Sequence, residues 1–349
     1  MAKITKPSVG GQALIEGIMM RGVKETAVAV RMPDGGIYKE VMKIKSIKDK
    51  LPILKLPLLR GVAGFIESMM LGYKCLMLSA EKSGLEDLEG TEEPSAFEKK
   101  ILGFFGDKLM KVVSGVAMVL GVLLSVVLFM YLPSLLFNGI KHLMGEGIAL
   151  YRALFEGVLK IFIFFLYLLL VSRMKDIRRT FEYHGAEHKS IFCYECDEEL
   201  TVENVRKKRR FHPRCGTSFM IVMMFVGIAV SFALSYFTKA DAHLYIWVPV
   251  KILVVPVIMG LGYEIIKIAG KYDNLFVRII SAPGMWMQRL TTKEPDDSQI
   301  EVAITALKAV LPEYQEEESK EPDAEVEVSE ESISALQCDE QAENHNDAQ

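Results

Sequence analysis

Four long apolar runs constrain the fold of this 349-residue chain more than any other feature. Each is close to the roughly 20 apolar residues that a helix needs to cross a bilayer, and such runs are rare in soluble cores. Because charged residues still make up 25% of the chain, the apolar content must be concentrated in these blocks. The sequence therefore predicts an α-helical integral membrane protein with about four transmembrane helices rather than a soluble protein with buried helices. The expected spans cover about residues 112–137, 150–171, 217–237 and 244–268.

The distribution of Lys and Arg between the spans predicts the orientation of the chain. Most basic residues of the connections fall in the segment 172–216, whereas the other two connections hold only Lys141, Arg152 and Lys239. Loops rich in Lys and Arg stay on the cytoplasmic side, so the segment 172–216 and both termini should be cytoplasmic. The two lysines of residues 1–12 have no apolar run behind them, so no cleavable signal peptide is expected. The sequence thus predicts a multi-pass protein of the cell membrane.

Residues 1–50 predict a small cytoplasmic element that contains a β-hairpin. Residues 26–32 and 37–42 are strand-like, and the Pro-Asp-Gly-Gly sequence between them is a turn signal. The glycine-rich stretch before the hairpin has two interpretations. It is either a tight structural loop or a lining of the functional site, with Glu16 or Arg21 facing that site.

The rest of the chain outside the spans divides into helices, a linker and a tail. Residues 51–111 predict an interfacial helix on the cytoplasmic surface, from about residue 60 to 80, and then an acidic linker; a fifth span is the weaker alternative. Residues 112–292 form the expected four-span membrane domain, and residues 293–312 an amphipathic helix. Residues 313–349 are rich in Glu and poor in aromatics, so we expect a disordered acidic tail that aids solubility rather than recruits a partner.

The segment 172–216 concentrates residue types that bind metals. It holds three of the six His and three of the five Cys, and thiols stay reduced in the cytoplasm. His184 and His188 are spaced i and i+4, which places both imidazoles on one helix face where they can bind a divalent metal such as zinc. Glu187 beside them can accept a proton from water, and the order His-x-x-Glu-His occurs in inverzincin metallopeptidases. The alternative is a His pair that caps or packs near a helix end.

A second pattern overlaps the first and predicts a different site. Cys193-x2-Cys196-x15-His212-x2-Cys215 has the spacing of a zinc ribbon with one Cys replaced by His. Four such ligands would close the coordination sphere and make the metal structural. The run of basic residues 206–210 inside this pattern is a solvated face or a contact for anionic lipid headgroups. It lacks interleaved aromatics, so nucleic-acid binding is not expected.

Ionisable residues inside the expected spans add further candidates. Glu264 falls at the cytoplasmic end of the fourth span, where it is a candidate third ligand or general base, or else a carboxylate that reaches water beside Lys267. Glu156 and Lys160 are spaced i and i+4 and are expected to pair with each other. Together with Lys251 they are expected to serve packing of the bundle, with a polar path through it as the alternative.

Several long motifs resemble those of the DUF1385 family. The resemblance covers about residues 8–311 and leaves out the acidic tail. It implies a membrane protein of a family described as a predicted metal-dependent enzyme. The motifs that carry it are residues 10–22, 182–189, 212–217, 290–295 and 299–303.

One departure from the family pattern bears on the metal site. Cys193 and Cys196 do not belong to that pattern, whereas the blocks around His184 and Cys215 do. The comparison weakens the four-ligand ribbon. It favours a site of His184, His188 and either Cys215 or His212, with the two other Cys as accessories of this chain.

Three functions are consistent with the sequence. The first is a metal-dependent hydrolase at the cytoplasmic face of the bilayer, with zinc as cofactor and Glu187 or Glu264 activating water. The second is a non-catalytic membrane scaffold or assembly factor that binds a partner complex through the same face, with the metal structural. The third, a transporter, is disfavoured because the spans are too few unless the chain forms an oligomer.

Overall fold

The computed structural model describes residues 9–43, 46–84, 109–212, 215–238, 243–269 and 275–314. Helices predominate among these residues, and a single sheet forms near the N-terminus. The expected acidic tail lies outside the described residues from residue 315 onward, as does most of the expected acidic linker.

The sheet is an antiparallel meander of four strands in the order β1-β2-β3-β4. The strands are β1 (Gly10–Leu14), β2 (Gly17–Arg21), β3 (Glu25–Arg31) and β4 (Ile37–Lys43). The expected hairpin is the β3–β4 pair, with Gly35 at a positive φ of 87° in its turn. The glycine-rich stretch forms no loop over its length, because it pairs as β1 and β2 with Gly11 opposite Met20.

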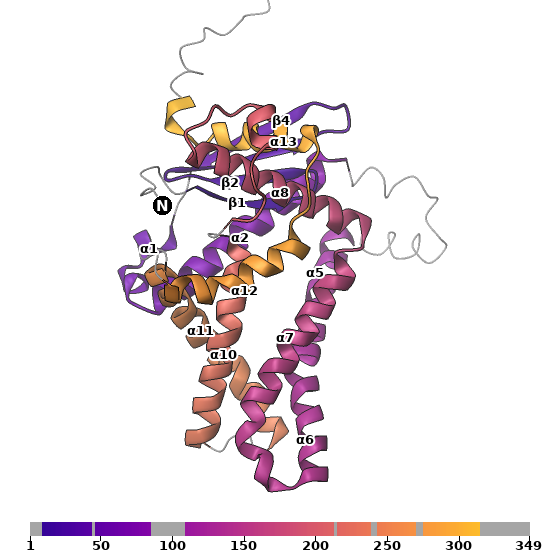
Figure 1. Cartoon of the computed structure of the whole chain (residues 1–349), viewed down its shortest axis with the longest axis vertical. Helices are drawn as coiled ribbons and strands as arrows, with labels where there is room; N and C mark the ends of the chain where they lie inside the picture. The colour runs from indigo at the N-terminus through magenta and orange to yellow at the C-terminus, as the bar shows by residue number, and fades with distance from the viewer. Residues whose placement is uncertain are drawn as a thin grey trace, which may run out of the picture. The chain divides into compact units, whose positions relative to one another are not determined.

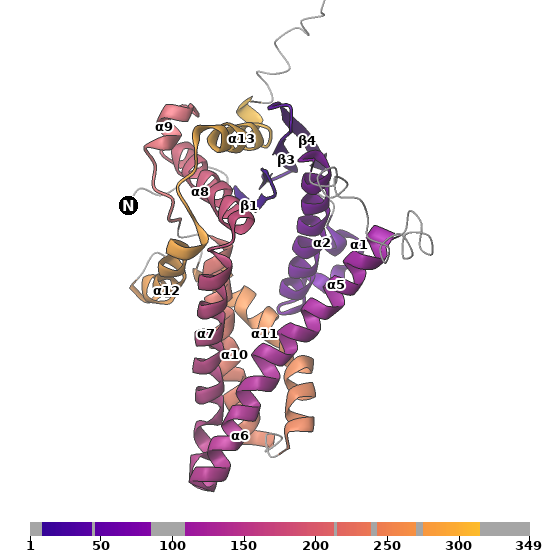
Figure 2. The ribbon, with the colours of Figure 1, turned by 90° about the vertical axis from the view of Figure 1, so that its right-hand side faces the viewer.

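Helices cover both faces of this sheet (Figure 2). Because side chains alternate along a strand, Val28 and Val30 of β3 share one face, where they pack with Leu14, Met19 and Cys75. Cys75 belongs to α2 (Leu59–Lys82). The opposite face lies against α8 (Lys175–Glu195) and α13 (Asp297–Lys308).

Besides α2, four helical stretches of the described residues are long and apolar enough to cross a membrane, and they coincide with the four expected spans. In Figure 1, α6, α7, α10 and α11 run alongside one another, and each contacts the next. α5 continues through a π-helical turn at Val127–Tyr131 into α6, so together they form the first span. The helices are α5 (Leu109–Val126), α6 (Leu132–Met144), α7 (Arg152–Val171), α10 (Gly216–Thr238) and α11 (Leu244–Ala269).

By length and composition α2 is a fifth helix that could cross a membrane. Its contacts divide it between the bundle and the sheet. Its first half packs on α11, where Arg60 forms an ion pair with Glu264. In its second half, Gly72 lies against Gln12 and the Ser79 hydroxyl donates to the Ile15 carbonyl. Because this half packs against the sheet, the interfacial position expected for this helix stays a prediction, with a fifth span as the alternative.

Helix α12 (Leu275–Thr291) packs against α10 and α7 and was not expected from the sequence. Its Trp286 stacks on Phe165 of α7 with ring centroids 5.4 Å apart. The described residues also form short elements: α1 (Ile47–Lys50), α9 (Val202–Arg206) and 3-10 helices at Pro52–Lys55 and Glu146–Tyr151.

Candidate metal centre

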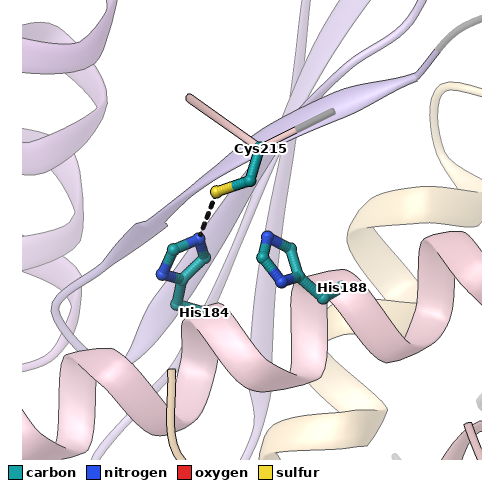
Figure 3. A group of neighbouring side chains, drawn as sticks. All are labelled: His184, His188 and Cys215. Carbon is teal, nitrogen blue, oxygen red and sulfur yellow. Dashed lines mark hydrogen bonds between the residues drawn. The ribbon is translucent and has the colours of Figure 1, made fainter. Parts of the chain in front are cut away.

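Helix α8 presents two imidazoles toward a thiol, as Figure 3 shows. His184 and His188 are one turn apart, with ring centroids separated by 4.4 Å. Cys215 comes from the residue just before α10, and its Sγ lies 3.3 Å from His184 Nε2. One ligand atom from each of the three residues lies within 4.8 Å of the other two. The fold thus brings together three side chains of types that bind metals, from segments that are 27 residues apart in sequence, from His188 to Cys215.

Backbone carbonyls hold the far side of both imidazole rings. His184 Nδ1 donates to the Thr291 carbonyl at 2.8 Å, and His188 Nδ1 donates to the Arg210 carbonyl at 2.5 Å. A carbonyl only accepts, so each Nδ1 carries the proton and each Nε2 keeps a lone pair, which on His184 faces the Cys215 Sγ. Metal-binding His residues are oriented in this manner in many proteins.

The donor set fits a zinc ion. His188 Nε2 is buried and has no hydrogen-bond partner among the described residues, and a buried polar atom without a partner requires an explanation. Burial lowers the pKa of His188, which favours the neutral ring that binds metals. Two imidazoles and one thiolate are ligands that zinc prefers. Zinc at this position would satisfy the orphaned nitrogen.

Glu187 is buried between α8 and the sheet. The backbone N–H of Gly11 donates to its carboxylate, and burial raises the pKa of Glu187, while His184 and His212 oppose that rise. A Cβ added at Gly11 would lie 2.9 Å from the carboxyl group and 2.7 Å from the Met19 carbonyl oxygen. Gly11 is therefore required for this close approach of strand and carboxyl group.

The structure does not assemble the expected zinc ribbon. Cys193 is buried and directs its Sγ to the Glu199 carbonyl at 3.4 Å, while Cys196 is exposed. His212 lies beside the cluster, 5.8 Å between ring centroids from His188, but its Nε2 faces Glu195 at 3.2 Å. Helix α8 continues through Cys193 and directs the two Cys away from Cys215, which separates the four expected ligands.

Glu264 is likewise not brought to the cluster. Its carboxylate pairs with Arg60 of α2 and ties that helix to α11. The expectation that Glu264 supplies a ligand or base is therefore not met by this geometry. The physical reason is the Arg60 guanidinium, which offers a bidentate partner close to the end of α11.

Ion pairs link α8 and the segment that follows it to the residues around the start of α13. Buried Lys189 pairs with Glu294 and also donates to the Arg206 carbonyl at 2.9 Å. Arg206 pairs with Asp297, and Arg210 lies 3.4 Å from Glu294. The basic run 206–210, for which a solvated face and a contact for anionic lipid headgroups are the two alternatives, is therefore largely engaged with acidic residues of the same chain.

Glu16 was a candidate for facing the site, and the structure gives it a different setting. It adopts a positive φ of 50° in the turn between β1 and β2. Its carboxylate forms a bidentate pair with Arg179 and accepts from the Tyr183 hydroxyl at 3.1 Å. These contacts fix the turn to the stretch of α8 directly before His184.

Sequence reasoning missed several groups that shape the centre. The carbonyls of Arg210 and Thr291 carry no side-chain signal, so no sequence pattern could have indicated them. The glycines offered a usable signal. Gly185, inside α8, leaves room for the Lys293 carbonyl, and a glycine in mid-helix often marks such close packing.

The fold and the cluster define a class: a helical protein with membrane-length apolar helices, a sheet enclosed by helices, and a His2Cys cluster beside that sheet. The chain belongs to the DUF1385 family, described as a protein of unknown function, whose model matches residues 56–313. The uncharacterized protein YqhQ of Bacillus subtilis (strain 168) is 34% identical over 308 residues, which cover 87% of this chain and 92% of that protein. No solved structure matches the chain.

Proposed function

We propose that the chain is a zinc-dependent hydrolase that works at the surface of the cell membrane. The observation that carries this proposal is the convergence of two imidazole Nε2 atoms and one thiol, with both Nδ1 atoms held by carbonyls. Three protein ligands leave a fourth position of tetrahedral zinc for water or substrate, as in catalytic zinc sites.

Partial exposure of the cluster supports catalysis over a closed structural site. His184 and Cys215 are half-buried, whereas His188 is buried. Zinc bound there would act as a Lewis acid toward a carbonyl or phosphoryl oxygen and promote deprotonation of water. Glu187 would accept the proton of the attacking water, and the Gly11 N–H would hold its carboxylate in place. Arg210 and Thr291 would keep both imidazoles in the binding tautomer.

A non-catalytic scaffold is the second candidate, and one observation favours it. The cluster joins α8 to the segment before α10. The hydrogen bond from His184 to the Thr291 carbonyl also joins α8 to the end of α12. A structural metal would thereby hold one surface of the molecule in shape for a partner protein. In both proposals the lipid bilayer surrounds the apolar helices.

Cobalt substitution distinguishes the two proposals. The purified full-length protein would be loaded with Co²⁺, whose spectrum reports a thiolate ligand and the coordination number. We expect one metal per chain, a thiolate band that is lost in Cys215→Ser and kept in Cys193→Ser/Cys196→Ser, and a spectrum that shifts when azide is added. The shift requires an open position, so its absence together with a retained thiolate band would favour the scaffold.

Glu187→Gln supplies the matched control for the hydrolase. The amide oxygen still accepts from Gly11, so metal content and the cobalt spectrum should stay unchanged. Any hydrolase activity found in a substrate screen should fall by about 10²–10⁴-fold, the usual contribution of general acid–base catalysis. Loss of metal in this variant would contradict the assigned roles.

A further inference from the structure

The buried charges of the helix bundle are one group of sequence candidates outside the candidate metal centre. Glu156 of α7 pairs with Arg152 of the same helix and with Lys251 of α11, and it accepts from the Trp247 indole N–H at 3.2 Å. The expected pair of Glu156 with Lys160 is therefore wrong. The side chains of Arg152, Glu156 and Lys251 are exposed by only 3%, 1% and 5%, which agrees with the expected role in packing of the bundle.

Cys193 and Cys196 are a second group outside the candidate metal centre, and both lie at the end of α8. Neither is in a disulfide. The helix ends in a Schellman motif, in which the Glu198 N–H donates to the Cys193 carbonyl at 3.2 Å. The Asp197 N–H donates to the Tyr194 carbonyl at 3.1 Å, and Asp197 has the left-handed φ of 58° that this motif requires. The motif therefore fixes the backbone of both cysteines.

The spacing of the two cysteines suits a disulfide between them. They are three residues apart at the last turn of α8, and helix geometry places Cα atoms at this spacing about 5 Å apart. Disulfides usually join Cα atoms that are roughly 4.4–6.8 Å apart. Side chains at i and i+3 also lie on the same face of a helix. The backbone thus already holds Cys193 and Cys196 at a distance that a disulfide spans.

The two thiols differ in their surroundings. The chain that follows the helix returns over buried Cys193, whose Sγ lies 3.4 Å from the Glu199 carbonyl oxygen, whereas Cys196 is exposed. Lys208 pairs with Glu198 and lies within electrostatic range of both thiols. A nearby ammonium favours the thiolate, which is the species that attacks a disulfide. An external disulfide can therefore reach Cys196, and Cys193 is placed to displace it.

We propose that Cys193 and Cys196 form a reversible dithiol–disulfide pair that reacts with a low-molecular-weight disulfide of the glutathione type. The Cys196 thiolate attacks one sulfur of that disulfide, which releases one small thiol and leaves a mixed disulfide on Cys196. Cys193 then loses its proton, attacks the Cys196 sulfur and expels the second small thiol. Two protein thiols are oxidised, and the external disulfide is reduced to two thiols that carry the two protons. Where cytosolic proteins have disulfides, these are usually transient and serve catalysis or redox sensing.

Peptide mass spectrometry of the full-length protein reads the pair directly. Trypsin releases residues 190–206 as one peptide, which contains Cys193 and Cys196 and no other cysteine of the chain. The reduced protein in detergent would be mixed with oxidised glutathione, and free thiols would be alkylated at intervals before digestion. We expect a peptide with one glutathione first. It should give way to a peptide that carries neither glutathione nor an alkyl group and is two hydrogens lighter than the reduced form.

Serine variants separate the roles of the two thiols. In Cys193→Ser the glutathione adduct on Cys196 should persist at least about tenfold longer than in wild type, because the internal thiol that displaces glutathione is missing. In Cys196→Ser the peptide should take up little glutathione, since the remaining Cys193 is buried. Cys75→Ser is the matched control and should react as wild type, because Cys75 packs against the sheet.

The wild-type protein alone decides the outcome if a variant fails to fold. A wild-type peptide 190–206 that stays fully alkylated at every ratio of oxidised to reduced glutathione would overturn the proposal. An adduct that persists in wild type as long as in Cys193→Ser would do the same, as would disulfide-linked dimers through Cys196 in place of the internal bond.

Discussion

Single residues decide how closely the sheet approaches the candidate metal centre. Gly11 of β1 donates its N–H to Glu187, and Gly185 admits the Lys293 carbonyl against α8. Both contacts depend on a missing Cβ. The two glycines thus place β1 and the segment after α12 against the helix that carries His184 and His188.

A paired substitution tests the role of Gly11. We expect Gly11→Ala to destabilise the protein by about 1–3 kcal/mol, because the new Cβ overlaps the Glu187 carboxyl group and the Met19 carbonyl. Gly10→Ala is the control, since its Cβ would meet no atom within 4 Å, and it should be neutral or stabilise by up to about 1 kcal/mol. Thermal unfolding in detergent measures both. Equal effects of the two substitutions would show that the strand simply shifts away.

At the level of elements, α8 is fixed by what surrounds it rather than by its own amphipathicity. It contacts β1, α9 and α13. Helix α13 begins with a capping box, in which Asp296 accepts from the Gln299 N–H at 2.9 Å and Gln299 reaches back to the Asp296 N–H at 3.0 Å. Gln299 also donates to Glu182 of α8. The cap therefore couples the start of α13 to the helix that carries His184 and His188.

Removing the cap should loosen α13 locally. We expect Asp296→Ala to cost about 1 kcal/mol, which would speed hydrogen exchange of the α13 amides about fivefold. Thr305→Ala in the same helix removes only a hydroxyl that donates to the Glu301 carbonyl, so its exchange should stay near wild type. Hydrogen–deuterium exchange read by mass spectrometry measures both, and unchanged exchange in Asp296→Ala would show that tertiary packing alone holds α13.

For the whole molecule, we infer that the sheet and its covering helices face the cytoplasm. The basic residues cluster at α8 and the segment that follows it, whereas the opposite connections are poor in Lys and Arg. Many of these cations form ion pairs within the chain. Because the orientation rule counts Lys and Arg rather than net charge, the pairing does not weaken the inference.

Thiol labelling tests this orientation. A variant that keeps exposed Cys196 as its sole cysteine should react with a membrane-impermeant maleimide only after the cells are permeabilised. Gly147→Cys in a cysteine-free chain should react in intact cells, since its side chain would have no neighbour within 4 Å and lies between α6 and α7. Labelling with the opposite pattern would reverse the proposed topology.

The sequence by itself determined the apolar helices, the β3–β4 hairpin and the family of the chain. These features are local: about twenty apolar residues suffice for a span, and a Pro-Asp-Gly-Gly turn suffices for a hairpin. The i and i+4 spacing of His184 and His188 likewise needs only a helix.

The tertiary structure decided which of the remaining residues meet. Cys215 approaches the imidazoles while Cys193 and Cys196 do not, because α8 continues past Cys193 and turns those thiols away. Glu264 and Glu156 take partners from other helices, Arg60 and Lys251. Such choices depend on distances between separate segments of the chain, and the pattern of a single segment carries no information about them.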